Sequence, residues 1–500
     1  MSVNPVTPSL HPEHSGYGVK KNPYFWLILI LFIASRFLFL AKFPFFYDSP
    51  EYLRHAVAGN YFKTLATVHI PAHPVYLFLI QKFHQWFSFL PVSVSVSLVS
   101  AVFGLIGFLA FYSLVRRLFG NKIALLSLLP LIFFPHLWLI QTNVLHEAVE
   151  QGLFLAGLLV FDHFLEKKSL WLFIATLILW SLPIINFLGI LIWFLAIIGL
   201  VYFRSTKKDL WKNLGWGIAV ILISLLIGLL GLYFILSLAI KNPWLNFQET
   251  VFGYGGGGII NDLSFVNLLR ILRNDFLILI NGYSIFALPI VVLVLVRLYL
   301  EKRYREIILL LSFFIPFLIT GKFWYGGLYG RYSVMVAYAF GLCFGLMLSQ
   351  NAYWLMMAGL ILSFIPTFLV YQQKPIALIE KTMIEKAWTN KKDLLILSDY
   401  QRPQLSLENT LYANGNLYDQ GRLEEAMALA FSENRRVFIS EQAVTFPYYQ
   451  YDGQQLHIIS RGDVKKSLFA YLLKNKKLIP VVSDENYPLL TIYEIGSFYR

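Results

Sequence analysis

Two acidic motifs hold the residues best suited to acid–base or metal chemistry in this chain. The first is Asp48-Ser49-Pro50-Glu51-Tyr52, and the second is the stretch 143–150, which contains Glu147 and Glu150. Carboxylates three residues apart lie on the same side of a helix, so Glu147 and Glu150 could bind a cation, orient a hydroxyl or share a proton. Each motif is also typical of a helix N-terminus, where Asp48 would cap the first turn and acids would complement the helix dipole. The residue types alone leave both interpretations open.

A basic and aromatic segment at 321–332 is a candidate site for an anion. An arginine at the start of a helix opposes the helix dipole, so Arg331 requires a compensating negative charge. Its planar fork matches phosphate oxygens, Lys322 can add a point charge, and Tyr332 lies beside them in the chain. The competing interpretation is a belt of interfacial aromatic side chains with a snorkelling arginine.

Histidine adds a third candidate group. His73, with Glu51 or Glu150, could orient an acceptor or hold a metal ion. His69 is a weaker partner for His73, because the two prolines in and after this stretch prevent both histidines from sharing one helical face. The single cysteine, Cys343, excludes an internal disulfide and any cysteine-based metal cluster. No cofactor is required by the sequence, although these donors are compatible with a divalent cation.

The composition dictates which elements position these residues. Hydrophobic residues make up 57% and charged residues only 14%, whereas a soluble chain carries about 25% charged residues. Runs of near 20 apolar residues predict transmembrane helices. Eleven such runs occur, at residues 23–41, 92–115, 123–140, 148–165, 169–185, 187–203, 213–240, 283–298, 306–320, 332–349 and 352–371. Arg36, inside the first run, is expected to snorkel toward the membrane surface.

The positions of the basic residues predict the orientation in the cell (inner) membrane. With a cytoplasmic N-terminus, the basic residues of the short loops gather on the inner side, as the positive-inside rule demands. This requires that residues 74–90 lie along the outer interface as an amphipathic helix instead of crossing. The net charge of +13 is spread between apolar runs, so membrane lipids are the expected partners and nucleic acid is not.

The expected domains are a cytoplasmic leader at 1–22, a transmembrane domain at 23–379 with outer loops 42–91 and 241–282, and an extracytoplasmic domain at 380–500. The last carries 15 basic and 15 acidic residues, a charge density typical of soluble domains. Strands are predicted at 393–398, 435–440 and 456–460, and helices at 423–431 and 464–477. The fold class is therefore an all-α polytopic membrane protein with a small C-terminal α/β domain.

The order of the short motifs resembles the GT-C superfamily of integral membrane glycosyltransferases. The resemblance is to the branch of protein O-mannosyltransferases and of the aminoarabinose transferases that modify lipid A, and it covers roughly residues 23–350. The motifs that carry it are Asp48-Ser49-Pro50-Glu51-Tyr52, His73-Pro74-Val75-Tyr76, Leu118-Phe119-Gly120, the 143–150 cluster and Gly330-Arg331-Tyr332. Two motifs depart from the family pattern: Ser49 stands where many relatives carry a second acid, and Val75 where they often carry proline.

The resemblance implies a sugar donor attached to a polyprenyl phosphate and used at the outer membrane face. It would make Asp48 the catalytic base, Glu147 the second acidic position with Glu150 as companion, and Arg331 the ligand of the donor phosphate. In-line attack by an acceptor hydroxyl would invert the anomeric centre, and the acceptor is a protein, lipid or envelope glycan. The alternatives are a transporter or flippase of lipid-linked sugars, or a ligase or polymerase using a lipid-diphosphate oligosaccharide.

Overall fold

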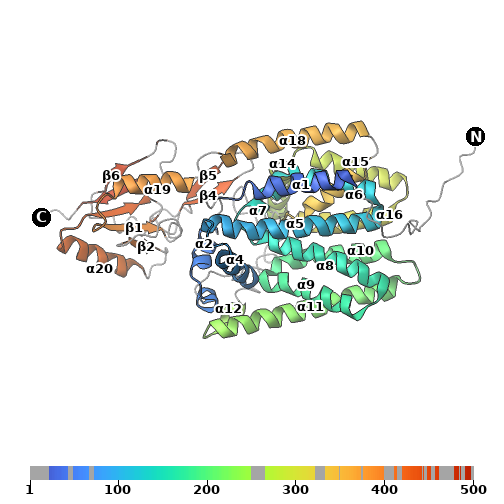
Figure 1. Cartoon of the computed structure of the whole chain (residues 1–500), viewed down its shortest axis with the longest axis horizontal. Helices are drawn as coiled ribbons and strands as arrows, with labels where there is room; N and C mark the ends of the chain where they lie inside the picture. Colours follow the sequence, from blue (N-terminus) through green and yellow to red (C-terminus); the bar gives the residue numbers. More distant parts are fainter. Residues whose placement is uncertain are drawn as a thin grey trace, which may run out of the picture.

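The structure is a computed structural model of the chain. It describes residues 22–42, 49–66, 73–248, 265–320, 333–347, 350–372, 376–398, 410–413, 419–441, 443, 447–451, 456–460, 478–483, 485 and 490–496. Figure 1 shows a long bundle of roughly aligned helices with a small sheet-containing domain at one end. This agrees with the predicted all-α membrane fold and its C-terminal α/β domain.

Every apolar run predicted to cross the membrane lies in one or two helices of the bundle. The helices that correspond to the eleven runs are α1 (Pro23–Phe37), α5 (Val92–Phe119), α6 (Asn121–Phe133) with α7 (Pro135–Thr142), α8 (Glu147–Lys167), α9 (Leu170–Asn186), η1 (Leu188–Phe194) with α10 (Leu195–Arg204), α11 (Leu210–Ala239), α15 (Ala287–Leu300), α16 (Tyr304–Thr320), α17 (Val336–Gly345) and α18 (Gln350–Gln372). By length and apolarity, four described helices could each cross a membrane, or five if α6 and α7 form one bent span.

Shorter helices cover one end of this bundle. They are α2 (Ser49–Val57), α3 (Tyr61–Leu65), α4 (Pro74–Trp86) and α12 (Pro243–Gln248). The longer helix α14 (Phe265–Tyr283) packs on α7, α15 and α16. Figure 1 shows α2, α4 and α12 at the end that faces the sheet domain, away from the N-terminus. The stretch predicted as an amphipathic interfacial helix is thus helical, and α4 packs on α2, α5 and α9.

The expectation that Arg36 snorkels to the surface is wrong. Its side chain is fully buried and donates to the carbonyl oxygens of Ile132 at 2.9 Å and Leu131 at 2.8 Å. These carbonyls lack helical partners because α6 and α7 meet at a 71° bend before Pro135, which has no N–H to donate. Arg36 therefore caps a helix end inside the bundle, where water cannot.

Small residues let α5 and α8 approach each other closely. A Cβ atom built on Gly152 would lie 2.4 Å from the backbone oxygen of Phe103, so only glycine fits there. Such contacts are the usual means by which membrane helices pack. Because Gly152 lies in the second turn of α8, this contact fixes the first turn, which carries Glu147 and Glu150, against α5.

Basic residues gather at the other end of α8. Asp162 is buried. Its carboxylate pairs with Arg117 of α5 at 2.6 Å and with Arg204 of α10. These ion pairs therefore link α5, α8 and α10 near the ends that precede three loops predicted to face the cytoplasm. Glu147 lies fifteen residues earlier on α8, which is about 22 Å along a helix axis.

The C-terminal domain is a mixed sheet with helices packed on it. Strands β2 (Thr410–Ala413), β1 (Leu394–Ser398) and β3 (Val437–Ser440) are parallel, and β7 (Ile492–Ile495) and β6 (Leu478–Val482) complete the order β2-β1-β3-β7-β6 with antiparallel pairs. Helix α19 (Ile376–Ala387) packs on β6 and β7, and α20 (Asp419–Ser432) on β2 and β3. A separate hairpin joins β4 (Pro447–Tyr451) and β5 (Leu456–Ser460).

The secondary structure of this domain agrees with part of the prediction. The predicted strands correspond to β1, β3 and β5, and the helix predicted at 423–431 lies within α20. The helix predicted at 464–477 lies outside the described residues. The apolar faces of β1 and β3 pack on Leu423 and Met427 of α20, which gives the domain a core of its own.

Candidate active site

The segment predicted to form the first outer loop is bonded to the chain at the second acidic motif. The backbone N–H of Ala41 donates to the carbonyl oxygen of Thr142 at 2.9 Å, and the hydroxyl of Ser49 donates to that of Val144 at 2.9 Å. Ser49 is fully buried. Residues on both sides of the 43–48 stretch are thus bonded to the chain just before Glu147.

His146 lies between the two carboxylates predicted from the sequence. Its Nδ1 is 2.6 Å from Oε1 of Glu150, and its Nε2 is 3.3 Å from Oε1 of Glu147. All three side chains are buried, with 2% of Glu147 and 4% of Glu150 exposed. Two carboxylates that share one imidazole hold it in a fixed plane, and a protonated imidazole there would offset one of their charges. Glu147 and Glu150 are therefore brought together, as their spacing predicts.

Asn186 connects this group to the end of α9. Its side-chain amide donates to Oε1 of Glu150 at 2.7 Å, and its Oδ1 accepts the backbone N–H of Tyr76 at 2.8 Å. Its own carbonyl oxygen lies 3.1 Å from Nδ1 of His73. One asparagine thus joins α4, α8 and α9, and it orients both Glu150 and His73.

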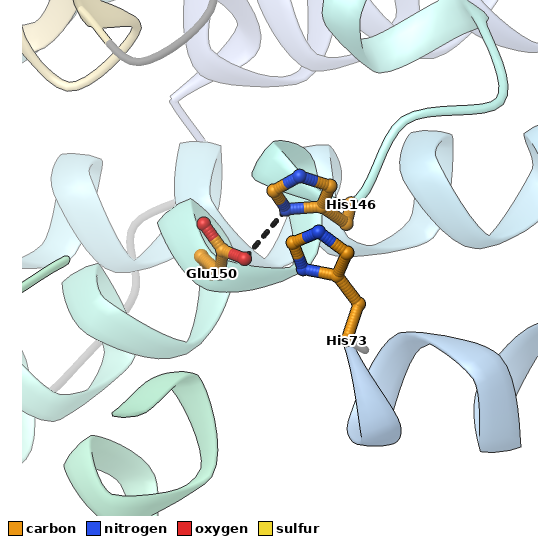
Figure 2. A group of neighbouring side chains, drawn as sticks. All are labelled: His73, His146 and Glu150. Atoms are coloured by element: carbon orange, nitrogen blue, oxygen red, sulfur yellow. Dashed lines mark hydrogen bonds and ion pairs between the residues drawn. The ribbon is translucent and has the colours of Figure 1, made fainter. Parts of the chain in front are cut away.

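His73 begins α4 in a left-handed conformation, with φ 45°, which turns its side chain back over α8. Its ring stacks on that of His146, with centroids 3.7 Å apart and planes 23° from parallel. Figure 2 shows the two imidazoles face to face, with Glu150 bonded to the nearer nitrogen of His146. His73 is buried, with 3% exposed. His73 and Glu150 therefore belong to one buried group, in which His146 contacts both of them.

Aromatic side chains enclose the histidine pair. Tyr52 meets the rings of His73 and Tyr76 edge-on, at centroid distances of 6.0 Å and 4.9 Å. Phe187 lies 5.7 Å from the His73 ring and 5.5 Å from that of His146. Such a lining lowers the local dielectric, so the charges within it interact more strongly than they would in water.

A pocket opens beside the acidic pair. Its free volume is about 20 Å³, close to the room that one water molecule needs, and Glu147 and Glu150 contribute to its lining. Val334 and Met335 line the opposite part, and the amide of Gln151 donates to the carbonyl oxygen of Val334 at 3.4 Å. Val334 follows Arg331 by three residues in the chain. The acidic motif and the start of the helix predicted to follow Arg331 therefore share one pocket.

Glu51 pairs with two residues of its own helix. Its Oε1 lies 3.2 Å from Nε2 of His55 and 3.5 Å from Nη2 of Arg54. Both residues lie about one turn after Glu51 in α2. The amide of Gln81 donates to the carbonyl oxygen of His55 at 2.9 Å, which holds α2 on α4. These contacts give Glu51 a role in fixing the first outer segment.

Several predicted site residues lie outside the described part of the chain. These are Asp48, Lys322, Arg331 and Tyr332, together with His69. Their proposed roles stay predictions.

Two residues of the cluster received no individual role from the sequence. His146 lies within the acidic motif, so a histidine between two candidate carboxylates was the available signal. Asn186 lies between the apolar runs 169–185 and 187–203, and a polar side chain in a membrane segment is costly unless it is bonded or used. The bonds of its side chain to Glu150 and to the backbone of Tyr76 account for that polarity.

The donor set of His73, His146 and Glu150 fits a divalent cation by type. Each offers one ligand atom, and these atoms lie within 4.8 Å of one another. Two imidazoles and a carboxylate are ligands that zinc and similar ions prefer. An imidazole directs its lone pair within the ring plane, so one of the stacked rings must turn before both can reach one ion. The residues are compatible with an ion once that rotation has occurred.

Comparison with known proteins places the fold. No protein-family model and no curated protein sequence matches the chain. Among solved structures, ArnT from Cupriavidus metallidurans bound to undecaprenyl phosphate matches with TM-score 0.55 at 12% identity, covering 95% of this chain and 97% of that one. The apo form of the same protein matches with TM-score 0.54, also at 12% identity and with the same coverage. The chain therefore shares the fold of these ArnT structures along nearly its whole length, which agrees with the fold that the family resemblance of its motifs predicts.

Proposed function

We propose that this chain is an inverting glycosyltransferase that moves a sugar from a polyprenyl-phosphate donor to an acceptor hydroxyl at the extracytoplasmic membrane face. The observation that carries the proposal is the pocket lined both by Glu147 and Glu150 and by Val334 and Met335. It brings an acidic motif next to the chain that follows Arg331. Undecaprenyl phosphate bound to the similarly folded ArnT supports a donor of this chemical class.

The proposal assigns the remaining predicted residues to the same site because each is close in the sequence to a residue of the site. Asp48 precedes Ser49, whose hydroxyl is bonded to Val144. Arg331 is three residues before Val334, which lines the pocket. These sequence positions support one site that contains Asp48, Glu147 and Arg331.

In the proposed reaction the acceptor oxygen attacks the anomeric carbon as its proton passes to the Asp48 carboxylate. The bond between the anomeric carbon and the phosphate oxygen breaks, and polyprenyl phosphate leaves with the electron pair. A phosphate needs little help from a general acid, so Arg331 and Lys322 serve by neutralising its growing charge, with Tyr332 as a further contact. Attack from the face opposite the phosphate inverts the anomeric centre.

The buried cluster serves to position the acceptor side of the site. Glu147 faces the pocket and can accept a hydrogen bond from an acceptor hydroxyl, while Glu150, His146 and Asn186 hold the first turn of α8 in place. A divalent cation held by His73, His146 and Glu150 would add a fixed positive charge to this region. In this proposal, Asp48 takes the proton, and Arg331 and Lys322 bind the phosphate.

The test is turnover by the purified full-length protein with radiolabelled polyprenyl-phosphate sugars and fractionated envelope glycans, lipids and proteins as acceptors. The expected result is transfer of label to one acceptor fraction, with release of an equal amount of polyprenyl phosphate and inversion at the anomeric carbon. Glu166→Gln, at the far end of α8, is the matched control and should retain turnover. Movement of intact donor across a liposome membrane without cleavage would instead support a transporter.

A further inference from the structure

A second, larger pocket lies at the opposite end of the bundle from the acidic cluster. Its free volume is about 330 Å³, and it lies between the α10–α11 connection and the α15–α16 turn. Arg204, which precedes the pocket-lining Ser205, pairs with Asp162 near the far end of α8. The proposed reaction therefore makes no use of this pocket.

Three cations that line this pocket are not paired with a carboxylate among the described residues. Within the part of the chain that the structure describes, no carboxylate lies within 4.0 Å of the side-chain nitrogens of Lys207, Lys302 or Arg305. Arg303, by contrast, is paired with Glu306 at 2.9 Å and with Glu301 at 3.3 Å. The lining thus keeps a net positive charge of three from Lys207, Lys302 and Arg305, which repel one another unless an anion is present.

Backbone hydrogen bonds close the turn that carries Lys302. Lys302 has φ 57°, its N–H donates to Tyr299 at 3.0 Å, and the N–H of Arg303 donates to Leu298 at 2.8 Å. This is the bonding pattern of a Schellman motif, in which the residue after the helix adopts the left-handed conformation. Glycine is the usual residue in this left-handed conformation, and a lysine there is strained. The side chain of Lys302 lines the pocket.

The surroundings of the pocket are those of a membrane surface. Tyr299 is 63% exposed and Tyr304 is 49% exposed, and their rings meet edge-on at a centroid distance of 6.1 Å. Leu300 between them is 73% exposed. Exposed tyrosines beside exposed apolar residues are typical of the level of the lipid headgroups. Basic pockets between membrane helices at that level suit phosphate-bearing headgroups.

We propose that this pocket binds the phosphate of one anionic lipid headgroup, held by Lys207, Lys302 and Arg305. The ligand is phosphate-bearing, and the exposed apolar rim favours a lipid over free phosphate because the acyl chains can lie against Leu300. The site is independent of the proposed catalytic site, which lies at the other end of α8.

The experiment is native mass spectrometry of the delipidated full-length protein, titrated separately with phosphatidylglycerol, phosphatidylcholine and inorganic phosphate. The expected result is one phosphatidylglycerol bound at least tenfold more tightly than phosphatidylcholine. Removing all three cations, in Lys207→Ala/Lys302→Ala/Arg305→Ala, should weaken that binding about 100-fold, and each single change about fivefold. Lys302→Arg should bind within about twofold of wild type.

Two controls make the result specific. Lys208→Ala removes a neighbouring exposed lysine that does not line the pocket and should bind lipid like wild type. Arg331→Ala, changed at the proposed donor site, should also keep this lipid. Equal losses in Lys208→Ala and in the triple variant would overturn the proposal. Binding of inorganic phosphate without selective binding of phosphatidylglycerol would overturn the lipid assignment. If the triple variant does not fold, the single variants carry the same comparison.

Discussion

The hydroxyl of Ser49 donates a 2.9 Å hydrogen bond to the carbonyl oxygen of Val144, although the two residues are 95 positions apart. This bond joins the residue after Asp48 to the residue three positions before Glu147. Two acidic motifs that each resemble an ordinary helix start are thereby brought to one place. Their joint position, more than the composition of either motif, supports an active site.

Arg331→Ala is expected to weaken binding of polyprenyl phosphate by about 10- to 100-fold, because a bidentate charged contact to phosphate is lost. Arg331→Lys should give an intermediate affinity, since lysine keeps the charge without the planar fork. Binding is measured with a fluorescent polyprenyl-phosphate analogue. Lys122→Ala, an exposed change in the first turn of α6, is the control. An unchanged affinity in Arg331→Ala would remove its assigned role.

Arg36→Met is expected to lower the free energy of unfolding by about 3 kcal/mol, because the carbonyls of Leu131 and Ile132 lose their donors inside the bundle. The measurement is the denaturation midpoint of the purified protein in detergent. Arg54→Ala, at a partly exposed arginine of α2, should change stability by less than about 1 kcal/mol. Similar losses in the two variants would mean that Arg36 does not cap α6 as described.

His73→Ala is expected to abolish stabilisation by a divalent cation. Zinc added to chelator-treated wild-type protein should raise the melting temperature, because a ligand that binds the folded state alone stabilises it. The residues that offer donors are His73, His146 and Glu150. His136→Ala, changed at a buried histidine outside this group, serves as the control. An equal rise in His73→Ala would show that any bound ion lies elsewhere.

Glu441→Gln is expected to stabilise the C-terminal domain at neutral pH. Burial raises the pKa of Glu441 above its ordinary value of 4.5, against a smaller opposing effect of a hydrogen bond from Tyr493. A raised carboxyl pKa means that the folded state loses stability as pH rises above 4.5, when the buried group must ionise. Hydrogen exchange of β3 and β7 in the full-length protein should show greater protection in the variant at pH 8. The difference should vanish near pH 4, and a difference that grew toward acid would contradict this sign.

Much of the fold could be predicted because membrane helices are encoded locally. Each of the eleven apolar runs corresponds to a helix or a pair of helices, since in lipid every backbone group must be bonded within its own segment. The sheet domain was harder. Strand β6 contains Pro480, which argues against a strand interior, yet β6 lies at the edge of the sheet, where the missing N–H costs little.

The site could be predicted only in part, since its geometry depends on contacts between distant segments. The pairing of Glu147 with Glu150 follows from helical spacing, whereas the stacking of His73 on His146 depends on how α4 packs against α8 and α9. The interpretation of Arg36 failed because snorkelling assumes a helix beside lipid. The sequence contains Pro135, which frees two carbonyls, but it does not show that Arg36 lies next to them.

The central claim is tested most directly by measuring turnover and donor affinity together in Asp48→Asn. Asparagine keeps the size and hydrogen-bonding capacity of the side chain but cannot take the acceptor proton. The account predicts turnover at least about 100-fold below wild type, with affinity for polyprenyl phosphate within about twofold and an unchanged melting temperature. Turnover within about threefold of wild type would contradict it.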